Sequence, residues 1–133
     1  MPILRADDGT LLEAPYTCAI ITCPAVHAGG VRRYVPEREG EIGPIMWKRI
    51  LKVLAVAEHH HHLALVLGAW GCGAFENDGN QIASLFREAL ATTFRGAFEH
   101  VVFAITDWSD EKRFIGPFQR IFNGGHEDFA PVA

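Results

Sequence analysis

The sequence is poor in cysteine and in basic residues, and each shortage excludes a class of protein. The three cysteines, Cys18, Cys23 and Cys72, form no CxxC pair. A disulfide framework and a zinc knuckle are therefore both disfavoured, and we expect reduced thiols. Twelve lysines and arginines against sixteen aspartates and glutamates give a formal net charge of −4. Without a positive field the chain has no general means of holding a nucleic-acid backbone, so nucleic acid is not an expected partner.

Long apolar segments are missing as well. No run approaches the roughly 18 apolar residues of a membrane span, and residues 1–10 contain no stretch typical of a signal peptide. We therefore expect a cytoplasmic protein without a membrane partner. The 133 residues are 49% hydrophobic and 21% charged, which is the composition of a globular domain and predicts a single module over residues 1–133.

The first third of the chain predicts a hairpin, a strand and a loop. Asp7–Thr10 is a turn signal between two apolar pairs and predicts a β-hairpin in the first dozen residues. Thr17–Thr22 is a short β-branched and apolar run ended by Pro24, as expected for a strand buried on both faces. Residues 24–43 hold four glycines among mixed charges and predict a long loop.

Strands and helices alternate in the rest of the chain. The apolar stripe after Pro44 predicts a helix that runs to about His62. Leu63–Leu67 and Val101–Ile105 are aliphatic runs that predict two strands. A helical stripe follows each strand, the first made of Ile82, Leu85, Phe86, Ala89 and Leu90, and the second of Ile115, Phe118, Ile121 and Phe122, ended by Asn123-Gly124. This alternation predicts an α/β fold with a mostly parallel sheet covered by helices, where ligands gather at the carboxyl ends of the strands.

The glycine-rich segment Gly68–Asp78 lies between a predicted strand and a predicted helix. Glycines let a backbone approach a phosphate closely, and the N-terminus of the following helix, capped by Asn77 or Asp78, adds partial positive charge. The segment is neither a Walker P-loop nor a GxGxxG dinucleotide fingerprint. Its two readings are a cradle for a diphosphate and a plain tight turn.

Three side chains in this segment also have two readings each. Trp70 and Phe75 are large aromatic residues in a predicted loop, so they pack either on a ribose or base of a ligand or back into the core. Cys72 is either a nucleophile activated at a helix N-terminus or a small packing residue. We favour packing for Cys72, because no partner base is evident in the sequence.

Two further groups of residues invite a functional reading. Asp107 and Trp108 follow the Val101–Ile105 strand, where they either contact an adenine or form a solvated strand end. The run His59–His62 points in different directions around a helix end, which suits the helix dipole better than metal coordination. No metal and no other cofactor is expected.

Several segments together resemble one known family, the microbial poly(ADP-ribose) glycohydrolases, which are macrodomain proteins. The resemblance covers nearly the whole chain and is carried, in the same order, by Asp7–Leu12, Pro15–Thr17, Ile21–Ala25, Leu67–Phe75 with Asn77-Asp78, and Val101–Ile105. It implies a macrodomain-like three-layer α/β/α sandwich with ADP-ribose, or an ADP-ribosylated protein, as the ligand. It also implies that Gly71 through Phe75 form a phosphate loop and that Phe75 lies close to the ribose distal to adenine. The candidate ligand-binding residues are Gly68, Ala69, Trp70, Gly71, Cys72, Gly73, Ala74, Phe75, Asn77, Asp107 and Trp108.

The chain departs from this family at its catalytic signature, a run of three glycines followed by a Gln-Glu-Glu triplet. Neither element is in the sequence, so the catalytic residues stay unknown. The resemblance therefore implies the C-terminal part of the domain, with a sheet that is incomplete on its N-terminal side. Three readings follow: an ADP-ribose recognition module, an enzyme completed by another chain that supplies the glutamates, and an inactive truncated domain.

An incomplete sheet also has a consequence for association. Its edge and its uncovered faces favour contact with another molecule. We therefore expect either a homo-oligomer or a complex with a complementing N-terminal half.

Overall fold

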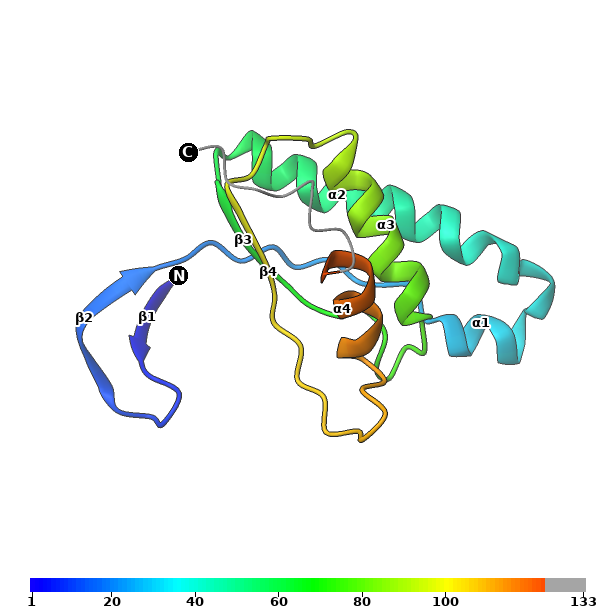
Figure 1. Cartoon of the computed structure of the whole chain (residues 1–133), viewed down its shortest axis with the longest axis horizontal. Coiled ribbons are helices and arrows are strands. Elements are labelled where there is room, and N and C mark those ends of the chain that lie inside the picture. The colour runs from blue at the N-terminus through cyan, green and yellow to red at the C-terminus, as the bar shows by residue number, and fades with distance from the viewer. Residues whose placement is uncertain (124–133) are drawn as a thin grey trace.

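The computed structural model describes residues 1–123, and these begin with a β-hairpin that stands apart from the helices (Figure 1). Strand β1 (Pro2–Arg5) pairs antiparallel with β2 (Leu11–Thr17). In the turn, the Asp8 carboxylate accepts hydrogen bonds from the backbone and the hydroxyl of Thr10, and Gly9 adopts a φ of +85°. The predicted hairpin is confirmed, although its second strand continues as far as Thr17.

The segment predicted as a long loop, residues 24–43, is largely helical, so that prediction was wrong. It contains helix α1 (Ala28–Tyr34) and the 3-10 helix η1 (Pro36–Glu41), and the long helix α2 (Ile42–His59) already begins within it. The His27 ring accepts a hydrogen bond from the Gly30 N–H and so caps α1. The Glu76 side chain lies against Gly29, where a Cβ atom would collide with it. The two glycines therefore serve close packing, and their presence does not indicate a loop.

The second half of the chain follows the predicted alternation. Strands β3 (Ala64–Leu67) and β4 (His100–Phe103) form a parallel pair, with Leu65 opposite Val101 and Leu67 opposite Phe103. Helix α3 (Gly79–Ala91) follows β3, and helix α4 (Ile115–Asn123) follows β4. Helix α4 extends to Asn123, the last described residue, and the predicted stop at Asn123-Gly124 therefore lies at the limit of the described residues.

The core lies between these helices and one face of the β3–β4 pair. Phe86 of α3 is 1% exposed and meets Phe103 of β4 edge-on, at a distance of 5.5 Å between ring centroids. Phe103 in turn packs against two rings of α4, Phe118 at 5.0 Å and Phe122 at 4.7 Å. Helix α2 adds three fully buried side chains, Met46, Ile50 and Leu54.

The other face of the pair is bare. Val66 of β3 and Val102 of β4 lie opposite each other there and are 78% and 55% exposed. The described residues therefore form an α/β fold with two separate two-stranded sheets, β1–β2 and β3–β4. The predicted mostly parallel sheet is reduced to one parallel pair, because the described chain supplies no further strand beside it.

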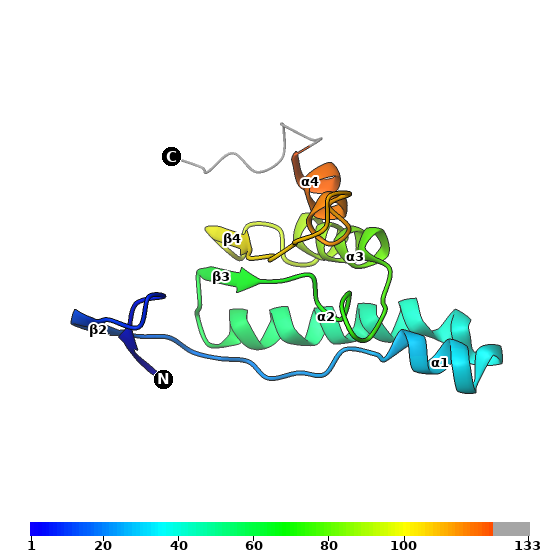
Figure 2. The same cartoon turned by 90° about the horizontal axis from the view of Figure 1, so that it is seen from below.

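The predicted buried strand Thr17–Thr22 is not buried, and within the described residues only Thr17 and Cys18 are paired, with Pro2 and Met1 of the hairpin. Beyond Thr17, which belongs to β2, the chain runs past β3 on the side away from β4 (Figure 2). Ile20 is 61% exposed and Ile21 is 40% exposed. The apolar composition is that of an interior strand, but the neighbours that would bury it are missing from residues 1–123.

Loss of the Phe86 ring should destabilise the fold, since it joins α3 to the β3–β4 pair. Phe86→Ala leaves a cavity in a closely packed core and should lower the free energy of unfolding by about 3–5 kcal/mol in a urea titration. Trp108→Ala serves as the control, because Trp108 is 93% exposed and its loss should change stability by no more than about 0.5 kcal/mol. Equal effects of the two substitutions would contradict this account of the core.

Candidate functional site

The glycine-rich loop, residues 68–78, connects the carboxyl end of β3 to α3 and is held in place by one buried side chain. The Asn77 amide donates to the carbonyl oxygens of Val26 at 2.7 Å and of Gly71 at 2.9 Å. Gly71 has a φ of +75°, and a Cβ atom there would lie 2.6 Å from Ala25 Cβ and from Asn77 Nδ2. Gly71 is therefore required by the conformation of the loop and by its close packing.

The N-terminus of α3 is capped by Asp78, one of the two residues predicted for this role. Its carboxylate accepts from the N–H of Asn80 at 2.7 Å and from that of Gln81 at 3.2 Å. These two helix N–H groups are therefore occupied. The positive end of the helix dipole still faces the loop.

Three consecutive N–H groups at the tip of the loop are free. Those of Gly73, Ala74 and Phe75 donate to no acceptor within residues 1–123, whereas those of Trp70, Cys72, Glu76 and Asn77 are bonded inside the loop. The three residues are exposed, and no atom lies within 4 Å of the position of a Cβ at Gly73. Successive free N–H groups in a turn are typical of anion-binding sites.

The two aromatic residues of the loop take different positions. Trp70 packs against the core with its ring centroid 6.5 Å from that of Phe86. Phe75 stays at the surface, 38% exposed, and stacks on the His27 ring at 4.9 Å. Of the two readings for each, Trp70 adopts the core position and Phe75 the exposed one.

Cys72 is buried beneath the loop. Burial, followed by the nearby Asp78 carboxylate, raises the pKa of its thiol to about 11. Its N–H is bonded to the Ala69 carbonyl oxygen. A thiol that stays protonated at neutral pH is a poor nucleophile, which favours the packing reading.

Arginines of α1 lie beside the acidic residues of the loop. Glu76 has a φ of +56°, its carboxylate lies 3.7 Å from the Arg33 guanidinium, and its carbonyl oxygen accepts from Arg32 at 3.0 Å. Arg32 also pairs with Glu39 at 2.8 Å. Sequence reasoning missed both arginines, because it treated their segment as a loop. The adjacent pair Arg32-Arg33 was the available signal.

A cavity of about 350 Å³ lies at the base of the loop. Arg32, Arg113 and Asp78 line it together with Asn77, whose buried Oδ1 atom has no hydrogen-bond partner within the described residues. None of the free N–H groups of Gly73–Phe75 belongs to this lining. A donor from water or from a ligand would satisfy the amide oxygen.

Asp107 and Trp108 come after β4, and Gly68 and Ala69 come after β3. All four residues therefore lie beyond the carboxyl ends of the parallel strands. The Ala104 N–H donates to the Leu67 carbonyl oxygen at 2.8 Å, which joins the two strand ends. Trp108 is 93% exposed, and its ring is available to a ligand.

Both oxygens of the Asp107 carboxylate are engaged. Oδ1 accepts from the N–H and the hydroxyl of Ser109, and Oδ2 accepts from the N–H groups of Phe114 and Ile115. These bonds, above all that from the Ser109 hydroxyl, hold the pKa of Asp107 well below its usual value. The carboxylate therefore closes residues 107–115 onto the start of α4.

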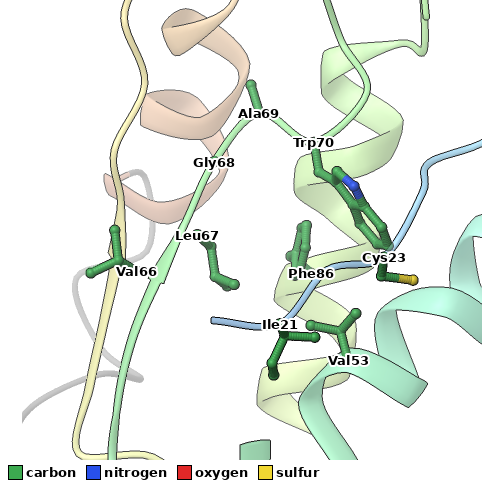
Figure 3. A pocket seen from close by; sticks show the side chains of 9 residues that line it. All are labelled: Ile21, Cys23, Val53, Val66, Leu67, Gly68, Ala69, Trp70 and Phe86. Atoms are coloured by element: carbon green, nitrogen blue, oxygen red, sulfur yellow. The ribbon is translucent and has the colours of Figure 1, made fainter. Parts of the chain in front are cut away.

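A second hollow borders the first part of the loop. It is an apolar groove of about 290 Å³ between β3 and the segment that contains Ile21 and Cys23, and it also includes Gly68, Ala69 and Trp70 (Figure 3).

None of the described helices is long and apolar enough to cross a membrane. Within residues 1–123, no three His, Cys, Asp or Glu side chains are grouped as metal ligands.

Comparison with protein-family models gave no match, and neither did comparison with curated proteins. Solved structures do match. The poly(ADP-ribose) glycohydrolase from Deinococcus radiodurans in complex with ADP-ribose is 44% identical over 92% of this chain and 50% of its own, with a TM-score of 0.87. The enzyme of that name from Thermomonospora curvata is 43% identical over 91% of this chain and 44% of its own, with a TM-score of 0.82. The chain thus spans about half the length of these relatives.

The Asp107 interactions predict a pH-dependent stability. A carboxylate with a lowered folded-state pKa stabilises the fold fully above its unfolded value of about 3.9, and this contribution is lost as the pH falls toward the folded-state value. Asp107→Asn should therefore lower the urea midpoint at pH 7, and its difference from the unsubstituted chain should shrink below about pH 4. Asp110→Asn, in the same loop and exposed, is the control. A difference that does not depend on pH would contradict this role.

Proposed function

The chain belongs to the microbial poly(ADP-ribose) glycohydrolase family, of whose solved members it spans about half, and we propose that it recognises ADP-ribose through the glycine-rich loop. The ligand is ADP-ribose itself or the ADP-ribose unit of a modified protein. The relative from Deinococcus radiodurans, solved in complex with ADP-ribose, supports this choice of ligand.

The observation that carries the proposal is the free tip of the loop. The N–H groups of Gly73, Ala74 and Phe75 are unpaired within the described chain and lie at the surface. Diphosphate oxygens accept hydrogen bonds from such groups, and the dipole of α3 favours the negative charge. Gly73 leaves room for a phosphate, because no atom lies within 4 Å of its Cβ position.

The charges around the loop are compatible with an anion despite the acidic composition of the chain. Asp78 is used as the cap of α3, and Glu76 faces Arg33. Both carboxylates therefore have a local partner, which reduces the repulsion that a diphosphate would meet.

We propose that two aromatic residues contact the rest of the ligand. Phe75 is stacked on His27 but remains 38% exposed, which leaves part of its ring for a ribose. Trp108 presents its ring to solvent at the end of β4, and we propose that it stacks on the adenine. Asp107 then shapes the loop that carries Trp108, since its carboxylate oxygens are already engaged.

Binding without hydrolysis is the activity proposed for the chain alone. Cleavage of the glycosidic bond needs a protonated carboxyl group to release the leaving oxygen. The two carboxylates within the loop are already engaged, since Glu76 lies 3.7 Å from the Arg33 guanidinium and Asp78 caps α3. An enzyme completed by a second polypeptide is the other candidate, and the coverage of only half of each relative favours it.

Ligand binding tests the role of the loop. ADP-ribose should bind more tightly than AMP or ribose phosphate in isothermal titration, because only ADP-ribose offers a diphosphate to the loop. Gly73→Val should weaken ADP-ribose binding roughly tenfold or more by filling the space of the phosphate, and the melting temperature should hardly change.

Gly40→Val is the matched control, since its Cβ position is also free of neighbours and lies in η1. Its ADP-ribose affinity should equal that of the unsubstituted chain. Equal binding of all three ligands, or an unfolded Gly73→Val variant, would contradict the phosphate-cradle reading.

Catalytic silence is the second expectation. The purified chain should release no ADP-ribose from poly(ADP-ribose) above background, because a general acid contributes typically about 10²–10⁴-fold. Release that disappears in Glu76→Gln would show that the acid is Glu76 and would overturn the silent-module reading. Release only after addition of a protein with the three glycines and the Gln-Glu-Glu triplet would favour the split enzyme.

A further inference from the structure

The apolar groove beside β3 has two walls made of extended chain, and we propose that it holds one β-strand of a partner. The partner is a polypeptide that carries the half of the family's domain which this chain does not span. This inference concerns the partner of the chain and stands on the groove, independently of whether ADP-ribose binds to the loop.

The first wall is the free edge of β3. The Leu63 carbonyl oxygen accepts hydrogen bonds from the N–H groups of Glu99 and His100, and the Leu67 carbonyl oxygen accepts one from the N–H of Ala104. Both oxygens therefore face β4. Successive residues of a strand direct their backbone groups to opposite sides. The N–H and C=O groups of Ala64 and Val66 therefore point away from β4, toward the groove, where the described chain offers no strand to pair with them.

The second wall is the segment that follows the hairpin. Within the described residues, the backbone groups of Ala19–Thr22 take part in no hydrogen bond. The segment is nevertheless extended, as Figure 2 shows, and it carries two isoleucines with large exposed areas. Its sequence predicted a strand buried on both faces, which is the state that a neighbouring strand on the groove side would produce.

The floor of the groove is apolar. Figure 3 shows Leu67 and Phe86 directed into it, with Val53 of α2 and Trp70 beside Ile21 and Cys23 on the opposite side. A segment that pairs with both walls in this setting buries its inward side chains against α2 and α3. The matching partner is therefore an extended apolar strand, because a helical segment would leave the backbone groups of both walls unpaired and a charged one would bury its charge against the apolar floor.

The remaining half of the domain fits this description better than a second copy of the chain. Half of the length of the Deinococcus radiodurans relative lies outside the region that matches this chain, so the family's domain contains further structure to occupy the groove. A second copy would have to insert an apolar extended segment with two free edges. Among the described residues, Ala19–Thr22 is such a segment, and it already forms a wall of its own groove.

A strand bound in the groove would also lie next to the proposed ligand site. Gly68, Ala69 and Trp70 line the groove and begin the glycine-rich loop. A strand in the groove would therefore end or begin beside the loop, where groups of the partner could meet a ligand bound there.

Co-expression tests the proposal. The tagged chain is produced together with an untagged polypeptide made of the residues of the Deinococcus radiodurans relative that lie outside the matched region. We expect a one-to-one complex on affinity purification, with its mass measured by light scattering. Val66→Pro should weaken the complex roughly tenfold or more, because it removes an N–H group that faces the groove, whereas Val66→Ala keeps that group and should bind normally.

A second pair of variants tests the apolar contact. Ile21→Glu places a charge in the groove and should weaken the complex, while Tyr34→Glu replaces an exposed residue of α1 outside the groove and should not. Circular dichroism checks that all four variants are folded. No complex, or a complex indifferent to Val66→Pro and Ile21→Glu, would overturn the proposal. A homodimer that Val66→Pro dissociates would also overturn it, in favour of a second copy.

Discussion

Asn77 is the one buried polar side chain among the described residues, and its hydrogen bonds hold the base of the glycine-rich loop. Its amide joins the segment before α1, through the Val26 carbonyl oxygen, to the glycine-rich loop, through that of Gly71. Its own N–H also bonds Gly71, and the next residue caps α3. Asn77 and Asp78 together thus connect the segment before α1, the glycine-rich loop and the start of α3. These hydrogen bonds hold the base of the loop, from which the tip with its free N–H groups extends.

The sequence alone was sufficient to predict those parts of the fold that are set by local pattern. The hairpin turn at Asp8-Gly9, the apolar stripe of α3 and the aliphatic runs of β3 and β4 lie close to where the periodicity indicates. The prediction of a long loop over residues 24–43 failed because two of the glycines serve tertiary and capping contacts. Gly29 makes room for the Glu76 side chain, and the Gly30 N–H donates to the His27 ring. A composition rule cannot distinguish a glycine that frees the backbone from one that allows a side chain to approach.

The candidate site was predictable to a similar degree. The glycine-rich loop and the cap at Asp78 follow from residue types in order along the chain. The free N–H groups of Gly73–Phe75 do not, because which amides of a loop are paired depends on its three-dimensional path. The engagement of both oxygens of Asp107 was also beyond reach, since it depends on residues further along the loop.

The alternation of backbone groups along β3 has a consequence for solvent exchange. The amide hydrogens that point to β4 are held in a ladder of hydrogen bonds, whereas those of Ala64 and Val66 face the groove. Neighbouring residues of the same strand would therefore exchange with deuterated water at very different rates. Protection at the even-numbered positions would appear only with a strand in the groove. The exchange rates of the Ala64 and Val66 amides therefore report whether a further strand is paired with β3.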